Sequence, residues 1–268
     1  MNLNNTWITG SLDGQTMRAY LTQPAASGDT PLPTVLVIQE VWGVDEHIQD
    51  MANRFAMAGY QAIAPDLYSL GETPEALSLP RIGAVKRFLD TVPPQAWVDP
   101  KVRDQHIDKL PPDEAKTVRE TLGILFSPRD NQRLVDQLKV WCDYALQHGR
   151  DVVSIGYCMG GQLSFLLATQ EPRLKAAVCN YGTAPQESNM ANIQAPVYGF
   201  YGGTDHRITD EVPKVAESMK KQGKTYHYKI YDEAGHAFFN DSRASYDVNA
   251  ARDAWARTLA FFNDVLQG

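Results

Sequence analysis

The run Asp151-Val-Val-Ser-Ile-Gly-Tyr-Cys-Met-Gly-Gly161 carries the strongest structural signal in the chain. Its first half is apolar and β-branched, which is typical of a buried strand, and residues 162–169 favour a helix. A strand, a glycine-framed turn and a helix form the context of a nucleophile elbow, G-x-S-x-G, with Cys158 here in place of the serine. Because a helix N-terminus favours a nearby thiolate, the pattern predicts a reactive cysteine.

This turn has two other interpretations. A glycine-rich turn between strand and helix can also bind pyrophosphate, but the spacing is not G-x-G-x-x-G, and Asn180 stands where the next strand should supply an acid. A cysteine that is simply buried in a tight turn would not need Gly156 and Gly160 beside it. The pattern therefore favours a cysteine nucleophile over a dehydrogenase loop or a structural cysteine.

Strands and helices alternate on both sides of this run. Besides an opening hairpin that turns at Asp13-Gly14, the expected strands are residues 34–39, 61–65, 151–156, 175–180, 196–200 and 226–231. Helical spacing of apolar residues recurs within residues 45–58, 134–145, 162–169 and 248–262. This alternation predicts an α/β fold with a mostly parallel, doubly wound sheet, helices on both faces, and ligands at the carboxyl edge of the strands.

Residues 71–130 interrupt this alternation. They hold eight of the sixteen prolines, including Pro93-Pro94 and Pro111-Pro112, together with many charges of both signs. The segment is interpreted as a Pro-rich insertion or cap within one α/β domain over residues 1–268. One interpretation of it is a solvated surface excursion. A lid over the active site is the other, because long loops in compact domains are often functional.

The composition limits the class of protein. With 268 residues, of which 43% are hydrophobic, the chain can form one sizeable core. A formal net charge of -7 without a basic cluster argues against nucleic acid and anionic membranes as partners. We expect neither a leader nor a membrane span. The number of cysteines is odd, and Cys142 and Cys179 fall in expected core elements. Reduced thiols and a cytoplasmic location are therefore expected. A monomer is the default, since the sequence does not determine the oligomeric state.

A cysteine nucleophile in this fold needs an acid and a base later in the chain, each in a loop after a late strand. Asp205 ends the run Gly202-Gly-Thr-Asp, and His236 ends the run Ala234-Gly-His, each just after an expected strand. Asp232 is a weaker substitute for the acid. The remaining histidines have no metal-ligand spacing and are expected to be structural or solvated, namely His47, His106, His148, His206 and His227. No metal and no organic cofactor is expected.

Four short motifs are spread along the chain. They are Gln39-Glu-Val-Trp-Gly43, Ala64-Pro-Asp-Leu-Tyr68, Gly156-Tyr-Cys-Met-Gly-Gly161 and Gly235-His-Ala-Phe-Phe239. Together they resemble the dienelactone hydrolase family, and the likeness covers nearly the whole chain apart from the insertion. The resemblance implies an α/β-hydrolase fold, hydrolysis of the lactone ring of carboxymethylenebutenolide-type compounds from catechol breakdown, and a catalytic triad of Cys158, His236 and Asp205.

The same resemblance gives roles to residues outside the triad. It implies that the backbone N–H groups of Val41 and Met159 form the oxyanion hole, and that Glu40 holds the resting thiol. Glu40 directly follows an expected strand on the carboxyl edge of the sheet, so its side chain could accept a hydrogen bond from Cys158 and disfavour the negative sulfur. A loop glutamate that only caps or meets solvent is the alternative.

The family's arginines that bind the substrate carboxylate have no secure match. Position 240, four residues past His236, is Asn240, while Arg243 lies three residues further on and Arg81 lies in the insertion. Either arginine could equally be a solvated surface residue. Trp42, inside the first motif, is a further candidate for substrate contact.

The sequence thus predicts a hydrolase of small lactones or esters that works through a thioacyl-enzyme and acts on a small-molecule substrate. A broader carboxylesterase or thioesterase on the same triad is the closest alternative. A binding protein that keeps the fold without catalysis is a third hypothesis. Fold alone would not exclude it, since fold does not determine function, but the complete predicted triad argues against it.

Overall fold

The computed structural model describes residues 2–28, 30–93 and 95–267. It divides into two compact units, Met1–Leu67 together with Asn131–Gly268, and Tyr68–Asp130. The larger unit contains the sheet, and the smaller unit corresponds closely to the Pro-rich segment of the sequence.

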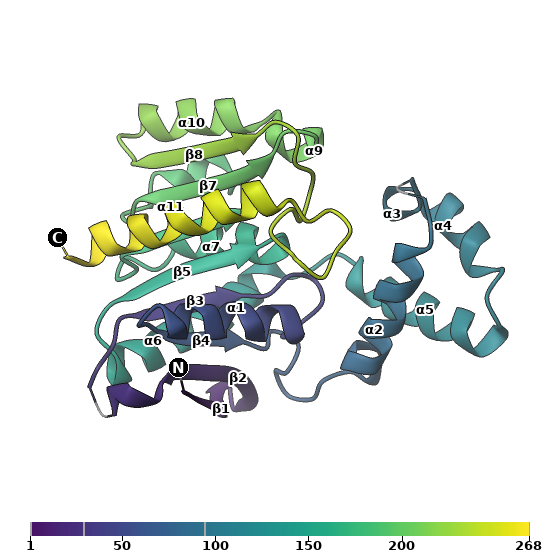
Figure 1. Ribbon diagram of the computed structural model, residues 1–268, viewed down its shortest axis with the longest axis horizontal. Helices are drawn as coiled ribbons and strands as arrows, with labels where there is room; N and C mark the ends of the chain where they lie inside the picture. The colour runs from purple at the N-terminus through teal and green to yellow at the C-terminus, as the bar shows by residue number, and fades with distance from the viewer. Residues whose placement is uncertain (1, 29, 94, 268) are drawn as a thin grey trace. The chain divides into compact units, whose positions relative to one another are not determined.

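The larger unit is built on a sheet that has, within the described residues, eight strands in the order β1-β2-β4-β3-β5-β6-β7-β8 (Figure 1). The first two pairings, β1 with β2 and β2 with β4, are antiparallel, and all the others are parallel. The strands are β1 (Leu3–Leu12), β2 (Gln15–Pro24), β3 (Thr34–Ile38), β4 (Gln61–Pro65), β5 (Val152–Tyr157), β6 (Ala176–Asn180), β7 (Val197–Gly202) and β8 (Tyr226–Tyr231). The predicted α/β fold with a mostly parallel sheet is therefore confirmed.

Helices cover both faces of this sheet. They are α1 (Glu46–Met57), α6 (Asn131–His148), α7 (Met159–Ala168), α8 (Glu187–Met190), α9 (His206–Thr209), α10 (Val212–Lys221) and α11 (Val248–Gln267), and a short 3-10 turn, η1 (Ala25–Ser27), follows β2. In Figure 1, α1 and α11 lie in front of the sheet, and α6 and α7 lie behind it. The front layer packs Phe55 of α1 and Phe262 of α11 against alternate strand residues such as Val35 and Ile155.

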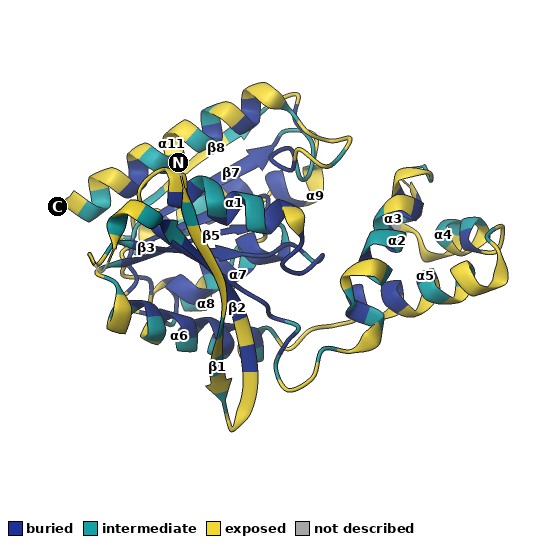
Figure 2. Cartoon of the chain, turned by 60° about the horizontal axis from the view of Figure 1, so that its bottom comes forward, coloured by how far each residue is buried: buried dark blue, intermediate teal, exposed yellow. Residues whose placement is uncertain are grey.

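Burial explains why the central strands have continuous apolar sequences. Every residue of β3, β4, β5 and β6 is buried, as the dark blue strands of Figure 2 show. A parallel strand covered by helices on both faces has no solvent-facing side, so polar residues do not alternate along it. The polar exception in β5, Ser154, is hydrogen-bonded to Ser164 of α7 at 2.8 Å between the two hydroxyl oxygens.

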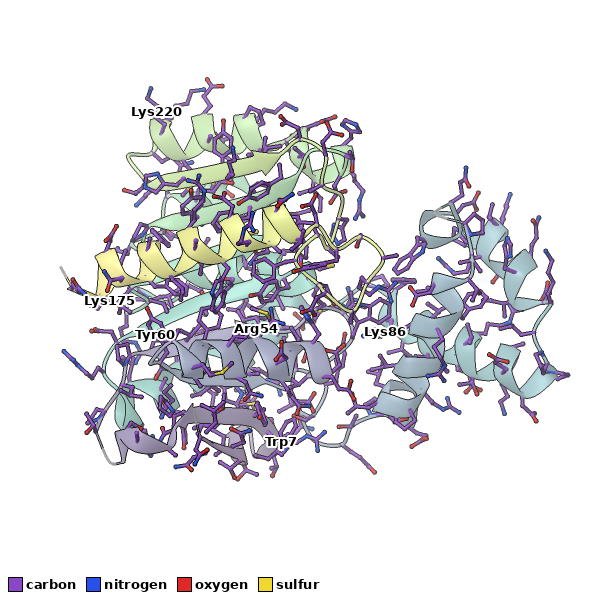
Figure 3. The ribbon with its side chains drawn as sticks, viewed as in Figure 1. Trp7, Arg54, Tyr60, Lys86, Lys175 and Lys220 are labelled. Carbon is purple, nitrogen blue, oxygen red and sulfur yellow. The ribbon has the colours of Figure 1, made fainter. Side chains whose placement is uncertain are left out.

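Local capping sets the ends of the helices. The side chain of Asp45 accepts a hydrogen bond from the Ile48 N–H at the start of α1, and Gly59, with φ 98°, follows its end. At the end of α10, Lys220 is exposed and points away from the sheet (Figure 3), where a cation complements the helix dipole. In the described ranges, no helix combines the length and the apolar character needed to cross a bilayer.

The smaller unit is helical. Its elements are η2 (Glu75–Leu77), α2 (Leu79–Asp90), α3 (Gln95–Val98), α4 (Pro100–Ile107) and α5 (Pro112–Leu125). Three of the prolines that interrupt the sequence pattern, Pro80, Pro100 and Pro112, stand in the first turn of a helix. Proline is well suited to that position, because its missing N–H would have no partner there. The prolines therefore begin helices rather than interrupt them.

Apolar contacts between α2 and α5 form the core of this smaller unit. Val85 and Leu89 of α2 and Val118 and Leu122 of α5 are buried there. The Thr121 hydroxyl, also buried, donates a 2.8 Å hydrogen bond to the carbonyl of Ala76 and so fixes η2 to α5. The unit therefore has its own small hydrophobic core.

Candidate active site

Cys158 stands in a strained turn between β5 and α7. Its φ is 54° and its ψ is -114°, a conformation that is costly for a residue with a Cβ. Glycine makes the turn possible, because a Cβ at Gly156 would collide with the carbonyl of Gly160, and one at Gly160 would collide with the carbonyl of Ile38. The close approach of these backbones leaves the Cys158 side chain half-buried at the carboxyl edge of the sheet. This is the geometry predicted from the glycine pattern.

The structure brings the predicted acid and base to this sulfur. His236 Nε2 lies 3.2 Å from Cys158 Sγ, and His236 Nδ1 lies 2.6 Å from Asp205 Oδ2. The two loops that carry them are joined by Thr204, whose N–H and hydroxyl both donate to the carbonyl of Ala234 at 3.0 Å. Cys158, His236 and Asp205 therefore form one hydrogen-bonded line. Asp232, the substitute considered for the acid, is exposed.

The charge of this line favours a protonated imidazole. Burial alone would lower the pKa of His236, but the Cys158 thiolate and the Asp205 carboxylate outweigh that effect and raise the pKa to about 10. The Tyr181 ring packs edge-on against the imidazole, with 5.2 Å between the ring centroids. A protonated imidazole between the Cys158 sulfur and Asp205 can donate its proton to a leaving group.

The two other cysteines are unsuited to catalysis. Cys142 and Cys179 are both fully buried, and burial raises the pKa of the Cys179 thiol to about 12. Cys142, in α6, has its pKa raised in the same direction and mainly by burial. A buried thiol with a raised pKa is a poor nucleophile, so Cys158 is the reactive cysteine candidate of the described chain.

The two predicted oxyanion donors lie on either side of the turn. Met159 is the first residue of α7, so its N–H has no carbonyl one turn earlier to bind and points out of the helix end. Val41 lies three residues after the end of β3, the strand whose Ile38 carbonyl packs against Gly160. The oxyanion role of the two N–H groups therefore stays a prediction of the resemblance.

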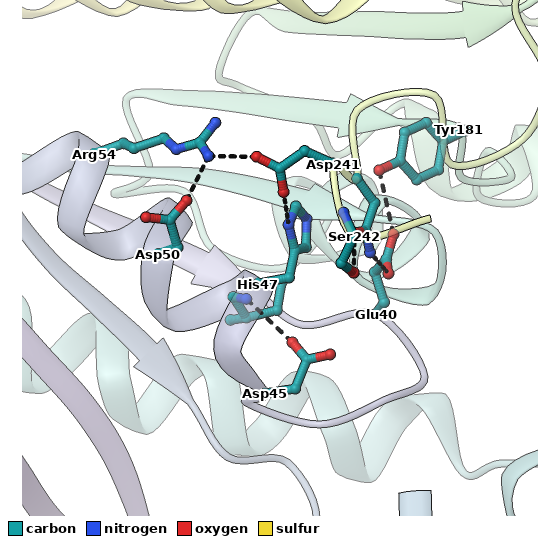
Figure 4. A network of polar contacts seen from close by, with 10 residues as sticks. Glu40, Asp45, His47, Asp50, Arg54, Tyr181, Asp241 and Ser242 are labelled. Carbon is teal, nitrogen blue, oxygen red and sulfur yellow. Dashed lines mark hydrogen bonds and ion pairs between the residues drawn. The ribbon is translucent and has the colours of Figure 1, made fainter. Parts of the chain in front are cut away.

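Glu40 has partners that the sequence did not indicate. Its side chain is buried, with 2% of the residue exposed, and its Oε1 accepts a 3.2 Å hydrogen bond from the Tyr181 hydroxyl. Its Oε2 accepts a 2.8 Å hydrogen bond from Asn240 Nδ2 (Figure 4). Within the described residues these two groups are its hydrogen-bond donors, and the Cys158 thiol lies against His236 instead. Burial, and next the Glu40 carboxylate, raise the pKa of Tyr181 far above its usual range, so the phenol remains a donor.

The residues next to Asn240 reach α1. Asp241 accepts a 2.6 Å hydrogen bond from Arg54, which also pairs with Asp50. The second oxygen of Asp241 lies 3.6 Å from Nδ1 of His47, a residue with 4% exposure (Figure 4). His47 is therefore structural, as expected, and belongs to a charged network that joins α1 to the loop after His236.

The candidate substrate-binding residues lie in different units. In the larger unit, the Arg243 guanidinium lies over the Trp42 ring, 5.6 Å from its centroid, so the structure brings these two candidates together. In the smaller unit, Arg81 Nη1 lies 2.8 Å from a carboxylate oxygen of Glu120. Each arginine thus already contacts a side chain of its own unit.

A cavity of about 240 Å³ opens in the larger unit beside the loop after β6. Its walls include Gly182 and Pro185 of that loop, Tyr201 of β7, and Arg207 and Val212 around α9 and α10. Gly182 packs so closely against the nucleophile turn that a Cβ there would lie 2.9 Å from the Cys158 carbonyl oxygen. The cavity wall therefore adjoins the backbone of the proposed nucleophile. Among the described residues, no group of three or more His, Cys, Asp or Glu side chains could hold a metal ion.

Comparison with known proteins gives one consistent family. A model described as the dienelactone hydrolase family matches residues 17–266. A protein from Saccharolobus solfataricus with the name "Putative carboxymethylenebutenolidase" is 35% identical over 254 residues, 94% of this chain and 96% of that protein. A protein of the same name from Escherichia coli K12 is 33% identical over 263 residues, 93% of this chain and 83% of that protein. The crystal structure of a "Putative Dienelactone Hydrolase from Klebsiella pneumoniae" has 30% identity and a TM-score of 0.72, over 98% of this chain and 99% of that chain.

Proposed function

The chain belongs to the dienelactone hydrolase family and is a hydrolase acting on ester bonds, and from this premise we propose that it cleaves small lactones and esters through a thioacyl-enzyme on Cys158. The observation that carries the proposal is the continuous line from Cys158 Sγ through His236 to Asp205. A nucleophile, a base and an orienting acid in this order satisfy the geometric requirement for covalent acyl transfer.

In the first half-reaction the Cys158 thiolate attacks the carbonyl carbon, and the π electrons move onto the carbonyl oxygen. The N–H groups of Val41 and Met159 stabilise that oxyanion, with the positive end of α7 behind Met159. The tetrahedral intermediate then collapses, and the bond from carbon to the ring oxygen breaks. The leaving oxygen takes the proton from His236 Nε2, which leaves a thioester on sulfur and a neutral imidazole.

In the second half-reaction His236 acts as the base. It takes a proton from water, the resulting hydroxide attacks the thioester carbon, and the thiolate leaves as the acid product forms. The imidazolium and the thiolate are thereby restored, so the cycle needs no external proton source. Asp205 keeps the imidazole in the correct tautomer and stabilises its charge in both halves.

The substrate proposed first is a dienelactone-like, carboxylate-bearing lactone of the kind that arises in aromatic compound degradation. Arg243 supports this choice, because it lies over Trp42, next in sequence to the proposed oxyanion donor Val41. A guanidinium there could bind a carboxylate of a substrate whose carbonyl occupies the oxyanion hole.

The three free cysteines, Cys142, Cys158 and Cys179, support a reducing cytoplasmic location.

A broader carboxylesterase or thioesterase is the second candidate, and Asn240 favours it. Position 240 carries an amide instead of a cation, and that amide is already bonded to Glu40. Esters without a carboxylate would then be accepted as readily as anionic lactones.

The test is a panel of short esters, thioesters and lactones, each lactone being supplied with and without a carboxylate. We expect turnover of several members and a substrate-derived mass on Cys158 when the reaction is quenched early. Higher kcat/KM for the carboxylate-bearing lactones would identify the first candidate, and equal values would identify the second. A protein with no turnover and no labelling of Cys158 by a thiol probe would be a binding protein of this fold, and the proposal would be wrong.

A further inference from the structure

Four consecutive residues, 240–243, in the loop after the catalytic histidine contact the segment after β3 and helix α1. Asn240 donates to Glu40, and Asp241 binds Arg54 of α1. Arg243 lies over the ring of Trp42. Ser242 contributes indirectly, because both its N–H and its hydroxyl donate to Asn240 Oδ1, at 3.0 Å and 2.7 Å.

The contacts of Ser242 fix which way the Asn240 amide faces. A backbone N–H can only donate, so the atom of Asn240 that faces Ser242 must be the oxygen, and Nδ2 must face Glu40. Asn240 is fully buried and Glu40 nearly so. The hydrogen bond between them is therefore shielded from water, where losing one partner leaves the other unsatisfied.

The Glu40 carboxylate joins three loops at the carboxyl edge of the sheet. Glu40 itself follows β3 and precedes Val41, Tyr181 follows β6 and packs on the His236 ring, and Asn240 lies in the same loop as His236. Tyr181 and Asn240 both lie on the His236 side of the site and both hold the Glu40 carboxylate. Through these two hydrogen bonds, Glu40 can fix the neighbouring Val41 N–H relative to His236. Such fixation affects the transition state, in which the oxyanion and the imidazolium must be correctly placed together.

We propose that Glu40 is a positioning residue, held by Tyr181 and Asn240, that fixes residues 40–42 relative to His236 and does not act on the Cys158 thiol. The inference rests on the proposed function, since the placement matters only if Cys158 and His236 perform acyl transfer. It replaces the role that the sequence resemblance implies for Glu40. The enzyme would then rest with its sulfur already directed at His236, without a substrate-triggered release.

The ionisation of Cys158 distinguishes the two roles. In the described part of the chain, Asp205 acts electrostatically on His236, Tyr181 and the buried Cys179 interact with Cys158, and Glu40 acts on Tyr181. Of these, Asp205 is hydrogen-bonded to the imidazole, whereas Glu40 is hydrogen-bonded to Tyr181 and Asn240. If Glu40 only positions, removing its charge leaves the pH profile of Cys158 alkylation unchanged while turnover falls.

The experiment exchanges the partners of one hydrogen bond. Asn240→Asp keeps an oxygen for Ser242 but presents a second carboxylate to Glu40, so we expect kcat to fall on the order of 10- to 100-fold. Glu40→Gln removes the charge and should lower kcat less. In the double variant, Gln at position 40 can donate to Asp at position 240 and still accept from Tyr181, so kcat should recover most of the loss. Asn192→Asp, at an exposed asparagine, is the matched control and should leave kcat unchanged.

Each variant is assayed for kcat, KM, melting temperature and the rate of Cys158 alkylation by iodoacetamide across pH. A double variant no more active than Asn240→Asp would overturn the pairing, and a shifted alkylation profile in Glu40→Gln would restore the thiol-holding role. If Asn240→Asp does not fold, Tyr181→Phe removes the other donor but keeps the ring on His236, and the same two readouts apply. Retained activity in Cys158→Ala would refute the proposed function instead, whatever the Glu40 and Asn240 variants do.

Discussion

The two compact units use their charged side chains differently. In the larger unit the acidic residues of the site are enclosed and hydrogen-bonded to fixed donors, as Asp205 is to His236 and Glu40 is to Asn240. In the smaller unit the ion pairs are exposed, and Arg119 bridges Asp104 and Asp108 on the surface. A buried polar group that loses its partner destabilises the protein, because no water can take the partner's place. In an exposed ion pair, water replaces the lost partner at little cost in free energy. We therefore expect substitutions in the first set to change activity strongly, and those in the second to change little.

The largest expected effect is the loss of turnover in Cys158→Ala. Removing the nucleophile of a triad lowers kcat by about 10⁴-fold or more, while the small change in side-chain volume should leave folding intact. Ester hydrolysis and circular dichroism of the same preparation measure the two properties. Covalent trapping of substrate on Cys142 or Cys179, with Cys158 unmodified, would show that the wrong cysteine has been assigned.

The next effect concerns His236 and Asp205 as a unit. His236→Ala should lower kcat as severely as loss of the nucleophile, and Asp205→Asn should lower it on the order of 10⁴-fold, because an amide holds the wrong tautomer. Since the residues act together, the double variant should be little worse than His236→Ala alone. A double variant whose loss equals the product of the two single losses would mean that Asp205 does not act through His236.

The sequence was sufficient to single out Cys158, His236 and Asp205, which the structure brings together, because the signals were local. Gly156 and Gly160 mark a turn whose backbone segments approach so closely that a Cβ at either position would collide with a neighbouring carbonyl. Asp205 and His236 each follow a recognisable strand. Parallel strands place their carboxyl ends at one edge, so chain order alone predicted that these side chains meet. The resemblance to a family then added Val41 and Met159 as the predicted oxyanion donors.

The partners of Glu40 could not be predicted in the same way. Its bond to Asn240 joins residues 200 positions apart, and the direction of the amide depends on Ser242, which no sequence pattern reveals. Tyr181 carried a weak signal, since it directly follows the buried strand β6 at the same edge. The helices of residues 68–130 were missed for a different reason, because prolines such as Pro100 and Pro112 interrupt a periodic pattern even where they begin a helix.

The pH dependence of stability tests whether the imidazole of His236 is protonated beside Asp205 and Cys158. The raised pKa of His236, about 10 against an ordinary value of 6.5, means that the folded protein binds this proton more tightly than the unfolded chain does. Its stabilising contribution is therefore complete below the unfolded value and is lost as the pH rises through about 10. Urea unfolding of wild type and His236→Gln should give free energies that converge over this window. A difference that stays constant would mean that no charged pair forms.

A smaller effect is expected from Arg243. If its guanidinium binds a substrate carboxylate, Arg243→Ala should raise KM for carboxylate-bearing lactones by about tenfold. A factor of this size corresponds to the loss of one charge-assisted hydrogen bond. The KM for neutral esters should stay unchanged. Arg243→Lys is the useful companion, because it keeps the charge but loses the flat group that lies over Trp42. An equal rise in KM for neutral and anionic substrates would indicate that Arg243 only supports Trp42.

The smallest effect is expected from Arg81, the other candidate for the carboxylate. Its guanidinium lies 2.8 Å from Glu120 and 3.9 Å from Glu75, so it would have to leave two carboxylates of its own unit before binding one from a substrate. Arg81→Ala should therefore change KM for anionic and neutral substrates by less than about twofold, since an exposed pair of this kind contributes little. Glu120→Gln is the sharper variant, because it releases Arg81 without removing it. Tighter binding of anionic lactones in Glu120→Gln, combined with weaker binding in Arg81→Ala, would show that the smaller unit takes part in substrate selection, and the division of roles between the units would have to be abandoned.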